Sequence, residues 1–176
     1  EFTPLSGALA MTGIPALQEL ARYEFTPGPG ADVLDIPGAP SMLPLVCYEA
    51  IFPNFVGSAE TRAGWIYNLS NDAWFGPTSG PRQHFNQASY RSIETGLPMV
   101  RSAALGVSGV VDSLGRARVT LDPSAEGVRD VALPGSLGRP PYSLWGDSPF
   151  LAFCILVLVG MAWQRFRLSR AAKHAS

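Results

Sequence analysis

Two apolar segments of the chain each end abruptly in a loop rich in polar and aromatic residues. Residues 43–46 lead into Cys47-Tyr48-Glu49, and residues 65–69 lead into a loop that carries Asn71, Asp72, Trp74 and Phe75. Short apolar segments bounded by turns are typical of buried strands. In α/β proteins the functional site lies at the carboxyl ends of neighbouring parallel strands. The pattern therefore predicts an α/β fold with a site at one edge of a sheet.

Cys47 is the side chain best suited to chemistry. It follows the first apolar segment directly, where a tight turn would present the thiol beside the first N–H groups of the next helix. Such N–H groups stabilise a thiolate or an oxyanion. An inert buried thiol is the alternative, because free cysteine is among the most buried residue types.

The other cysteine and the two histidines do not suggest a disulfide or a metal site. Cys154 lies in an apolar run far from Cys47, and His84 and His174 are widely separated. Without a C-x-x-C pair or a histidine cluster, the spacing of metal ligands is missing. We expect no disulfide, no metal and no cofactor.

The C-terminal region predicts a membrane-spanning helix. Every residue from Pro149 to Trp163 is apolar or small, and Trp145 and Trp163 bracket the run as interfacial aromatic residues do. Fifteen helical residues reach about 22 Å, short of the roughly 30 Å hydrocarbon core. The span must therefore take length from residues 142–145 or Phe166, or thin the bilayer. A buried core helix is the alternative.

Charge favours the membrane interpretation and predicts an orientation. Four of the 13 basic residues follow Trp163, whereas the other nine and all 14 acidic residues precede it, a net charge of −5. By the positive-inside rule, the tail 167–176 should be cytoplasmic, residues 142–166 the span with its interfacial flank, and the domain 1–141 periplasmic. An acidic domain also argues against nucleic acid as a partner.

Periodicity and turn residues predict the remaining elements. Helices are expected at Ile51 to Ala63, with Pro53 in the first turn, and at Arg82 to Thr95, which Gly96-Leu97-Pro98 would end. The second helix should bury Phe85, Ala88, Ser89 and Ile93. Further strands are expected at 99–103, 107–112, 116–121 and 128–133, with a hairpin turn at 113–115. Residues 14–23 fit either a short helix or a membrane-facing loop.

Three motifs carry a resemblance to a known family. They are CYE at 47–49, SNDAWFG at 70–76 and GPRQHFNQASYRSIETGLPMVRSA at 80–103. Together they resemble the carbon-nitrogen hydrolase (nitrilase) superfamily, and within it the apolipoprotein N-acyltransferase family of bacterial membrane enzymes. The resemblance is strongest over residues 41–112. It implies part of a nitrilase-like αββα sandwich, followed here by one transmembrane helix.

The same resemblance implies a Cys-Lys-Glu constellation, of which this chain supplies only the cysteine. In the family the glutamate is the general base, and the lysine stabilises the tetrahedral oxyanion. Lys173 is the sole lysine and follows the predicted span. Both missing groups lie upstream of the cysteine in the family. We therefore interpret the chain, which begins at Glu1 without methionine, as a C-terminal fragment that is inactive alone.

Roles for other residues also follow from the resemblance. Cys47 would be the nucleophile, Tyr48 would offer its backbone N–H to the oxyanion, Glu49 would help to position the site, and Glu1 would be a supporting carboxylate. Asn71, Asp72, Trp74 and Phe75 would bind substrate from the loop above the sheet. Each has a simpler alternative: Glu49 could stabilise a helix start, Glu1 could be an exposed terminus, and the aromatic pair could be packing. His84 is interpreted as a hydrogen-bonded structural residue.

The predicted activity is a two-step acyl transfer at the membrane. A phospholipid would donate a fatty acyl chain to Cys47, and the N-terminal amine of a diacylglyceryl-cysteine lipoprotein would accept it. Two alternatives stay open at this point. One is a nitrilase-type amidase of small amides, and the other is a catalytically dead, membrane-anchored binding domain.

Overall fold

The computed structural model describes residues 11, 13–15, 30–57, 59 and 61–174, with side chains described as far as residue 167. The chain divides into two compact units, Glu1–Gly138 and Arg139–Ser176. Glu1 and most of the segment 14–23 lie outside the described residues, so their predicted roles stay predictions.

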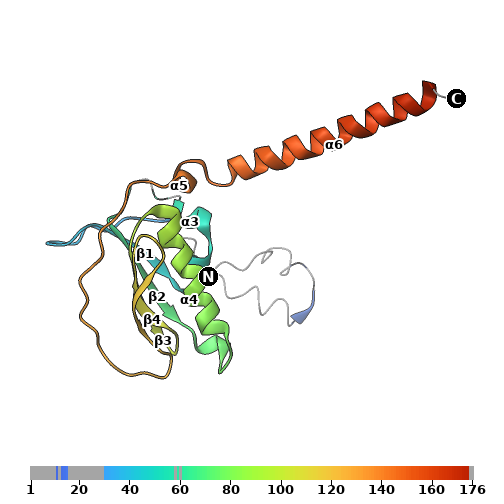
Figure 1. Ribbon diagram of the computed structural model, residues 1–176. Helices are drawn as coiled ribbons and strands as arrows, with labels where there is room; N and C mark the ends of the chain where they lie inside the picture. The colour runs from blue at the N-terminus through green and yellow to red at the C-terminus, as the bar shows by residue number, and fades with distance from the viewer. Residues whose placement is uncertain (1–10, 12, 16–29, 58, 60, 175–176) are drawn as a thin grey trace. The chain divides into compact units, whose positions relative to one another are not determined.

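The first unit is built on one mixed sheet (Figure 1). Its five described strands lie side by side in chain order. They are β1 (Met42–Val46), β2 (Trp65–Asn71), β3 (Met99–Ala104), β4 (Ser108–Val111) and β5 (Ala117–Leu121). The first three strands are parallel, and the last three form antiparallel pairs. The carboxyl ends of β1, β2 and β3 therefore meet at one edge, as the two loop-ending segments predicted. The expected strands at 99–103, 107–112 and 116–121 are confirmed.

The hydrophobic core lies on one face of this sheet. Alternate residues of a strand point to the same face, and Leu43, Leu45, Ile66, Met99 and Val111 are each at most 2% exposed. The parallel register places Leu43 beside Ile66 and Ile66 beside Met99, so the three strands bury one continuous apolar row. The helix α4 (Gly80–Thr95) runs across this region of the sheet in Figure 1 and contributes Ala88 to the core.

Helix α4 buries a stripe at helical spacing that differs from the predicted one at its C-terminal end. His84, Ala88, Arg91 and Ser92 are buried at i, i+4 and i+7 or i+8. Ala88 and Ser89 confirm the predicted inner face, and Phe85 packs partly buried against the core. The predicted burial of Ile93 was wrong, because this residue is 46% exposed. The helix ends at Gly96, whose φ of 69° is the left-handed conformation that glycine adopts readily.

The helix expected at 51–63 is instead two short helical segments. A 3₁₀ helix, η1 (Cys47–Ile51), begins directly at the cysteine, and α3 (Pro53–Gly57) follows it. Phe52 between them is extended, with φ −96° and ψ 107°. The residue before a proline avoids the helical region, so Pro53 separates the two segments. Pro53 does occupy the first position of α3, as predicted.

The expected strand at 128–133 was wrong. Residues 122–140 form no helix or strand, and Val128 is 87% exposed. Hydrogen bonds tie the end of this segment down instead: Leu137 N donates to Gly96 O at 2.8 Å, and Ser113 Oγ donates to Gly135 O at 2.7 Å. Among the described residues, Val128 therefore has neither a pairing strand nor a core to face, although it has the side chain of a strand residue.

The second unit consists of the short helix α5 (Pro141–Trp145) and the long helix α6 (Ser148–His174). The segment Ser148–Arg167 of α6, 20 residues, is long and apolar enough to cross a membrane by length and composition. Twenty residues reach about 30 Å, the thickness of the hydrocarbon core. Compared with the apolar run at 149–163, this segment gains Ser148 at one end and residues 164–167 at the other. Residues 142–145 do not extend it, because Gly146, with a φ of 52°, ends α5 before α6 begins.

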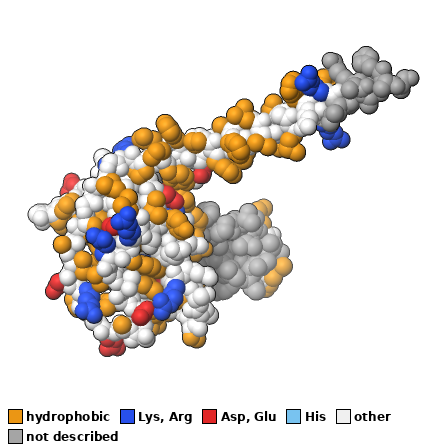
Figure 2. Space-filling model, viewed as in Figure 1, with side chains coloured by type: hydrophobic (Ala, Val, Ile, Leu, Met, Phe, Trp, Pro, Cys, Tyr) orange, Lys and Arg blue, Asp and Glu red, His pale blue; other side chains and the backbone are white. Residues whose placement is uncertain are grey.

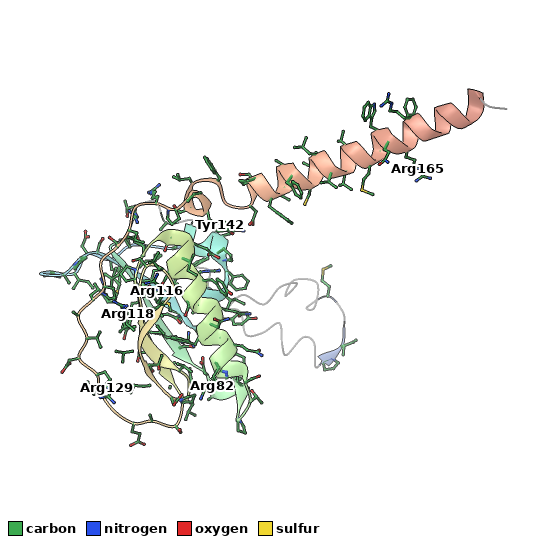
Figure 3. All side chains as sticks on the ribbon, in the orientation of Figure 1. Arg82, Arg116, Arg118, Arg129, Tyr142 and Arg165 are labelled. Atoms are coloured by element: carbon green, nitrogen blue, oxygen red, sulfur yellow. The ribbon has the colours of Figure 1, made fainter. Side chains whose placement is uncertain are left out.

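The side chains of α6 change in character along the helix. Figure 2 shows hydrophobic side chains along most of α6 and basic ones toward its C-terminal end, where Figure 3 labels Arg165. The Arg167 guanidinium lies 4.7 Å from the centre of the Trp163 ring, a cation–π contact suited to the membrane interface. These features are consistent with the predicted span. The predicted boundaries at 141 and 166 and the sidedness stay predictions.

Candidate active site

Cys47 lies on a strained turn at the carboxyl end of β1. Its φ is 49°, and Leu105 is the only other non-glycine residue with positive φ among those described. A side chain in this conformation costs about 1 kcal/mol, and such strain gathers at functional sites. Val46 before it is still extended, with φ −94° and ψ 118°, so the chain turns at the cysteine itself. The half-buried thiol is thereby carried out of the strand and onto the edge of the sheet.

Glu49 stabilises this turn from within. Its Oε2 accepts a hydrogen bond from Val46 N at 2.7 Å, so the carboxylate folds back over the cysteine that separates the two residues. The first N–H groups of a short helix have no partner inside it, and Tyr48 N belongs to this set in η1. Tyr48 is 51% exposed, and its ring packs 5.6 Å from the Phe52 ring, centre to centre. The predicted oxyanion role of Tyr48 N–H stays a prediction.

Ser70 is the polar side chain nearest the thiol in the described contacts. Its Oγ lies 3.6 Å from Cys47 Sγ and 2.7 Å from Asp72 Oδ1. Ser70 is on β2, on the same face as the buried residues Ile66 and Asn68. Sequence reasoning did not single it out. The signal that could have found it is the alternation of side chains along β2. Ser70 is two residues after Asn68 and therefore points to the same face, at the carboxyl end of the strand.

Behind Ser70 lies a buried network of charged and polar side chains. Arg101 and Asp72 are 2% and 1% exposed, and the guanidinium donates to Asp72 Oδ2 at 2.8 Å and to Oδ1 at 3.0 Å. Arg101 also donates to Val107 O at 3.2 Å and to Asn68 Oδ1. His84 Nδ1 lies 2.9 Å from Asp72 Oδ1. The buried charges are thus paired and hydrogen-bonded, as burial requires.

Asn68 connects this network to the backbone of the cysteine turn. Its Nδ2 donates to Leu45 O at 2.9 Å and lies 3.4 Å from Cys47 O, while its Oδ1 accepts from Arg101. Arg101 therefore acts on the turn through one intermediate side chain. Neither Asn68 nor Arg101 was predicted from the sequence, where an asparagine inside a strand and an arginine after Met99-Val100 carry no distinguishing signal.

Burial and pairing act in opposite directions on the pKa values of Asp72 and Arg101. Burial raises the pKa of Asp72, but the hydrogen bond from Ser70, the charge of Arg101 and the hydrogen bonds from His84 and Arg101 outweigh it, so the pKa of Asp72 falls below its usual 3.8. Burial lowers the pKa of Arg101 below its usual value, opposed by the charge and hydrogen bond of Asp72 and by the nearby Cys47. The network thus places a buried Arg101–Asp72 ion pair behind Ser70.

The loop after β3 closes over Asp72. Asp72 N donates to Ala104 O at 2.9 Å, and a Cβ at Gly106 would collide with the Asp72 carboxylate. Only glycine lets this backbone approach so closely. Asp72 is therefore fixed from β3 as well as from α4.

The four predicted substrate-binding residues lie in different environments. Trp74 is 84% exposed on η2 (Ala73–Phe75), and Asn71 Oδ1 accepts from Ala73 N at 3.1 Å. The Phe75 ring packs 5.6 Å from the buried His84 ring. Asp72 faces inward, where its oxygens contact Arg101, His84 and Ser70. This placement favours a positioning role for Asp72, and the substrate contacts of the other three stay predictions.

His84 is hydrogen-bonded and 3% exposed, in keeping with its structural interpretation. Its Nε2 has no hydrogen-bond partner among the described residues. No group of three His, Cys, Asp or Glu side chains that could hold a metal ion occurs in the described part of the chain.

Comparisons with known proteins agree with the family resemblance of the sequence motifs at 47–49, 70–76 and 80–103. The chain is 44% identical over 162 residues to an apolipoprotein N-acyltransferase from Bradyrhizobium diazoefficiens, covering 90% of this chain and 30% of that protein. It is 38% identical over 172 residues to one from Caulobacter vibrioides, covering 97% of this chain and 32% of that protein. The chain thus spans about a third of the length of these curated relatives.

Solved structures with some likeness include an amidase from Nesterenkonia sp. AN1, with acrylamide added at its active-site cysteine. That likeness has a TM-score of 0.46 and 25% identity, over 58% of this chain and 42% of the amidase. The carbon-nitrogen hydrolase family model matches residues 15–140, which include the whole sheet, the cysteine turn and α4. The chain therefore belongs to the carbon-nitrogen hydrolase family.

Proposed function

We propose that this chain carries the nucleophile of an apolipoprotein N-acyltransferase. The observation that carries the proposal is the strained turn at Cys47, with a φ of 49° at the carboxyl end of β1, in a chain whose relatives bear that name. The turn presents a thiol beside the first N–H groups of η1, which have no partner inside that helix, an arrangement suited to nucleophilic attack on a carbonyl.

In the first step Cys47 Sγ attacks the ester carbonyl of a phospholipid. The sulfur–carbon bond forms, the carbon–oxygen bond to glycerol breaks, and the lysophospholipid leaves with a proton. The thiol proton passes to a general base, and Tyr48 N–H at the start of η1 stabilises the oxyanion. The family resemblance assigns the base to a glutamate and further oxyanion stabilisation to a lysine, both expected from outside residues 1–176.

In the second step the N-terminal amine of a diacylglyceryl-cysteine lipoprotein attacks the thioester. The amide bond forms, the carbon–sulfur bond breaks, and Cys47 recovers a proton from the amine. Two lipid substrates are the physical reason for the apolar helix α6, whose 20-residue apolar segment can hold the domain at a bilayer. The four basic residues after Trp163 support a cytoplasmic tail and a periplasmic domain, by the positive-inside rule.

The test is to detect the acyl intermediate on Cys47. The full-length protein in its native membrane, supplied with phospholipid, is digested with trypsin, and the peptide from Tyr23 to Arg62 is weighed by mass spectrometry. We expect a fatty acyl mass on Cys47 that hydroxylamine removes. The variant Cys47→Ser should lose acyl transfer, and Cys154→Ser is the matched control. Wild-type protein without acyl mass, or full transfer by Cys47→Ser, would overturn the proposal.

A further inference from the structure

The hydroxyl of Ser70 lies between the thiol and the most buried carboxylate of the site. We propose that Ser70 is a second catalytic residue, whose hydrogen bond with Cys47 Sγ reverses direction when the thiol ionises. This inference deepens the proposed function and rests on Cys47 being its nucleophile.

The geometry gives Ser70 two neighbours but only one proton to donate. Its Oγ is 2.7 Å from Asp72 Oδ1 and 3.6 Å from Cys47 Sγ. A hydroxyl has one donor and two acceptor lone pairs, and a thiol is a weak donor. While Cys47 is neutral, Ser70 O–H donates to the carboxylate and its lone pair accepts the S–H. The shorter distance to Asp72 fits this arrangement.

Ionisation changes what the sulfur requires. Once the thiol proton has passed to the general base, Sγ is an acceptor that carries the negative charge. The Ser70 proton then rotates from Asp72 Oδ1 to Sγ, and no covalent bond of Ser70 breaks. Hydrogen bonds to an ionised partner are stronger than those between neutral groups, so the rotation favours the thiolate.

Asp72 can lose the hydrogen bond from Ser70 because other groups still donate hydrogen bonds to its carboxylate. Its Oδ1 stays within 3.0 Å of the Arg101 guanidinium and 2.9 Å of His84 Nδ1, and Oδ2 keeps its bond to Arg101 at 2.8 Å. Buried acceptors left without a donor are costly. The two Arg101 bonds keep a donor on each Asp72 oxygen, so the Ser70 hydroxyl can turn toward Sγ without that cost.

Charges around the thiol do not replace this hydrogen bond. Glu49 lies on the same turn, Asp72 and His84 meet behind Ser70, and Arg101 lies on β3. Arg101 interacts electrostatically with Cys47, and its pairing with Asp72 offsets part of that charge. Ser70 is the group in direct contact with Sγ.

The experiment measures how pH controls alkylation of Cys47 in the full-length protein. Iodoacetamide is added from about pH 6 to about pH 10, and the rate is followed by mass spectrometry of the Cys47 peptide. We expect Ser70→Ala to lower the rate near neutral pH about tenfold and to move the pH midpoint up by about one unit. Ser102→Ala on β3 is the control, because this exposed serine alternates with the buried Arg101 and should leave both values unchanged.

A second pair of variants separates the hydroxyl from packing. Ser70→Thr and Ser70→Val have nearly the same shape, and only threonine keeps the hydroxyl. We expect Ser70→Thr to alkylate with the wild-type midpoint and Ser70→Val to follow Ser70→Ala. Equal midpoints for threonine and valine, or a wild-type midpoint for Ser70→Ala, would overturn the proposal. Alkylation needs no acyl donor, so a missing acyl intermediate in wild-type protein would refute the proposed function separately.

Discussion

At the scale of single residues, the site depends on an ion pair that is sealed from water. Arg101 and Asp72 are joined by bonds of 2.8 and 3.0 Å, and neither side chain is exposed. Removing charged groups from water costs several kcal/mol per ion, which good geometry and further hydrogen bonds must offset. His84, Ser70, Asn68 and Val107 O supply those bonds. The pair therefore holds the side chains behind Cys47 in one arrangement.

Replacing Asp72 should destabilise the domain and flatten its response to acid. The pKa of Asp72 is lowered in the folded state, so its contribution is fully present above about pH 4, the unfolded value, and is lost as pH falls through the folded value. Asp72→Asn leaves Arg101 buried without its counter-ion, and we expect a loss of about 3 kcal/mol at neutral pH. Thermal unfolding of the detergent-solubilised full-length protein across pH would measure both effects.

Asp122→Asn is the control for this variant, because Asp122 pairs with Arg82 at 3.1 Å on the surface with both side chains more than 60% exposed. Exposed pairs contribute little, so this variant should unfold as the wild type does. An Asp72→Asn protein as stable as wild type near neutral pH would contradict the role of the buried pair.

At the scale of elements, α4 supports the short helix that starts with the nucleophile. Arg91 is 5% exposed, and its guanidinium donates to Ile51 O, the last residue of η1, at 2.9 Å and to Glu94 Oε1 at 2.6 Å. A five-residue 3₁₀ helix has few internal bonds. The orientation of η1, and with it Cys47, therefore depends on a side chain 40 residues further along the chain.

We expect Arg91→Gln to loosen η1 and to lower kcat of acyl transfer about ten- to a hundredfold, since small misplacements of a reacting group have effects of this size. Initial rates against phospholipid concentration would separate kcat from KM. Arg82→Gln is the matched control, because Figure 3 shows Arg82 at the start of the same helix and its side chain is 68% exposed. Wild-type kcat in a folded Arg91→Gln protein would show that η1 needs no such support.

At the scale of the whole molecule, attachment to the membrane should depend on the apolar face of α6. Val157 lies near the middle of the segment Ser148–Arg167. We expect Val157→Arg to disfavour membrane insertion of α6 by about 3 kcal/mol. Alkaline carbonate should therefore release more of the variant protein from the membrane fraction. The test uses α6 fused to a soluble reporter, and Val157→Leu should remain in the membrane fraction. Equal retention of both fusions would contradict a membrane-spanning role.

Local sequence determined the features that depend on neighbouring residues. The apolar run from Pro149, the stop at Gly96 and the strands on either side of the 113–115 turn follow from composition, helix capping and turn chemistry. The position of Cys47 at the end of a strand follows in the same way. The strand expected at 128–133 failed because β-branched residues such as Val128 form a strand only where a neighbouring strand or a core receives them.

Tertiary structure alone decided what surrounds the thiol. Ser70 lies 23 residues from Cys47, and Arg101 lies 33 residues from Asn68. These side chains meet because β1, β2 and β3 are parallel and in a register that brings their carboxyl ends to one edge. No local pattern marks an isolated serine or arginine as part of a site. Burial of the apolar row from Leu43 to Met99 selects that register, and the register in turn assembles the polar network behind Cys47.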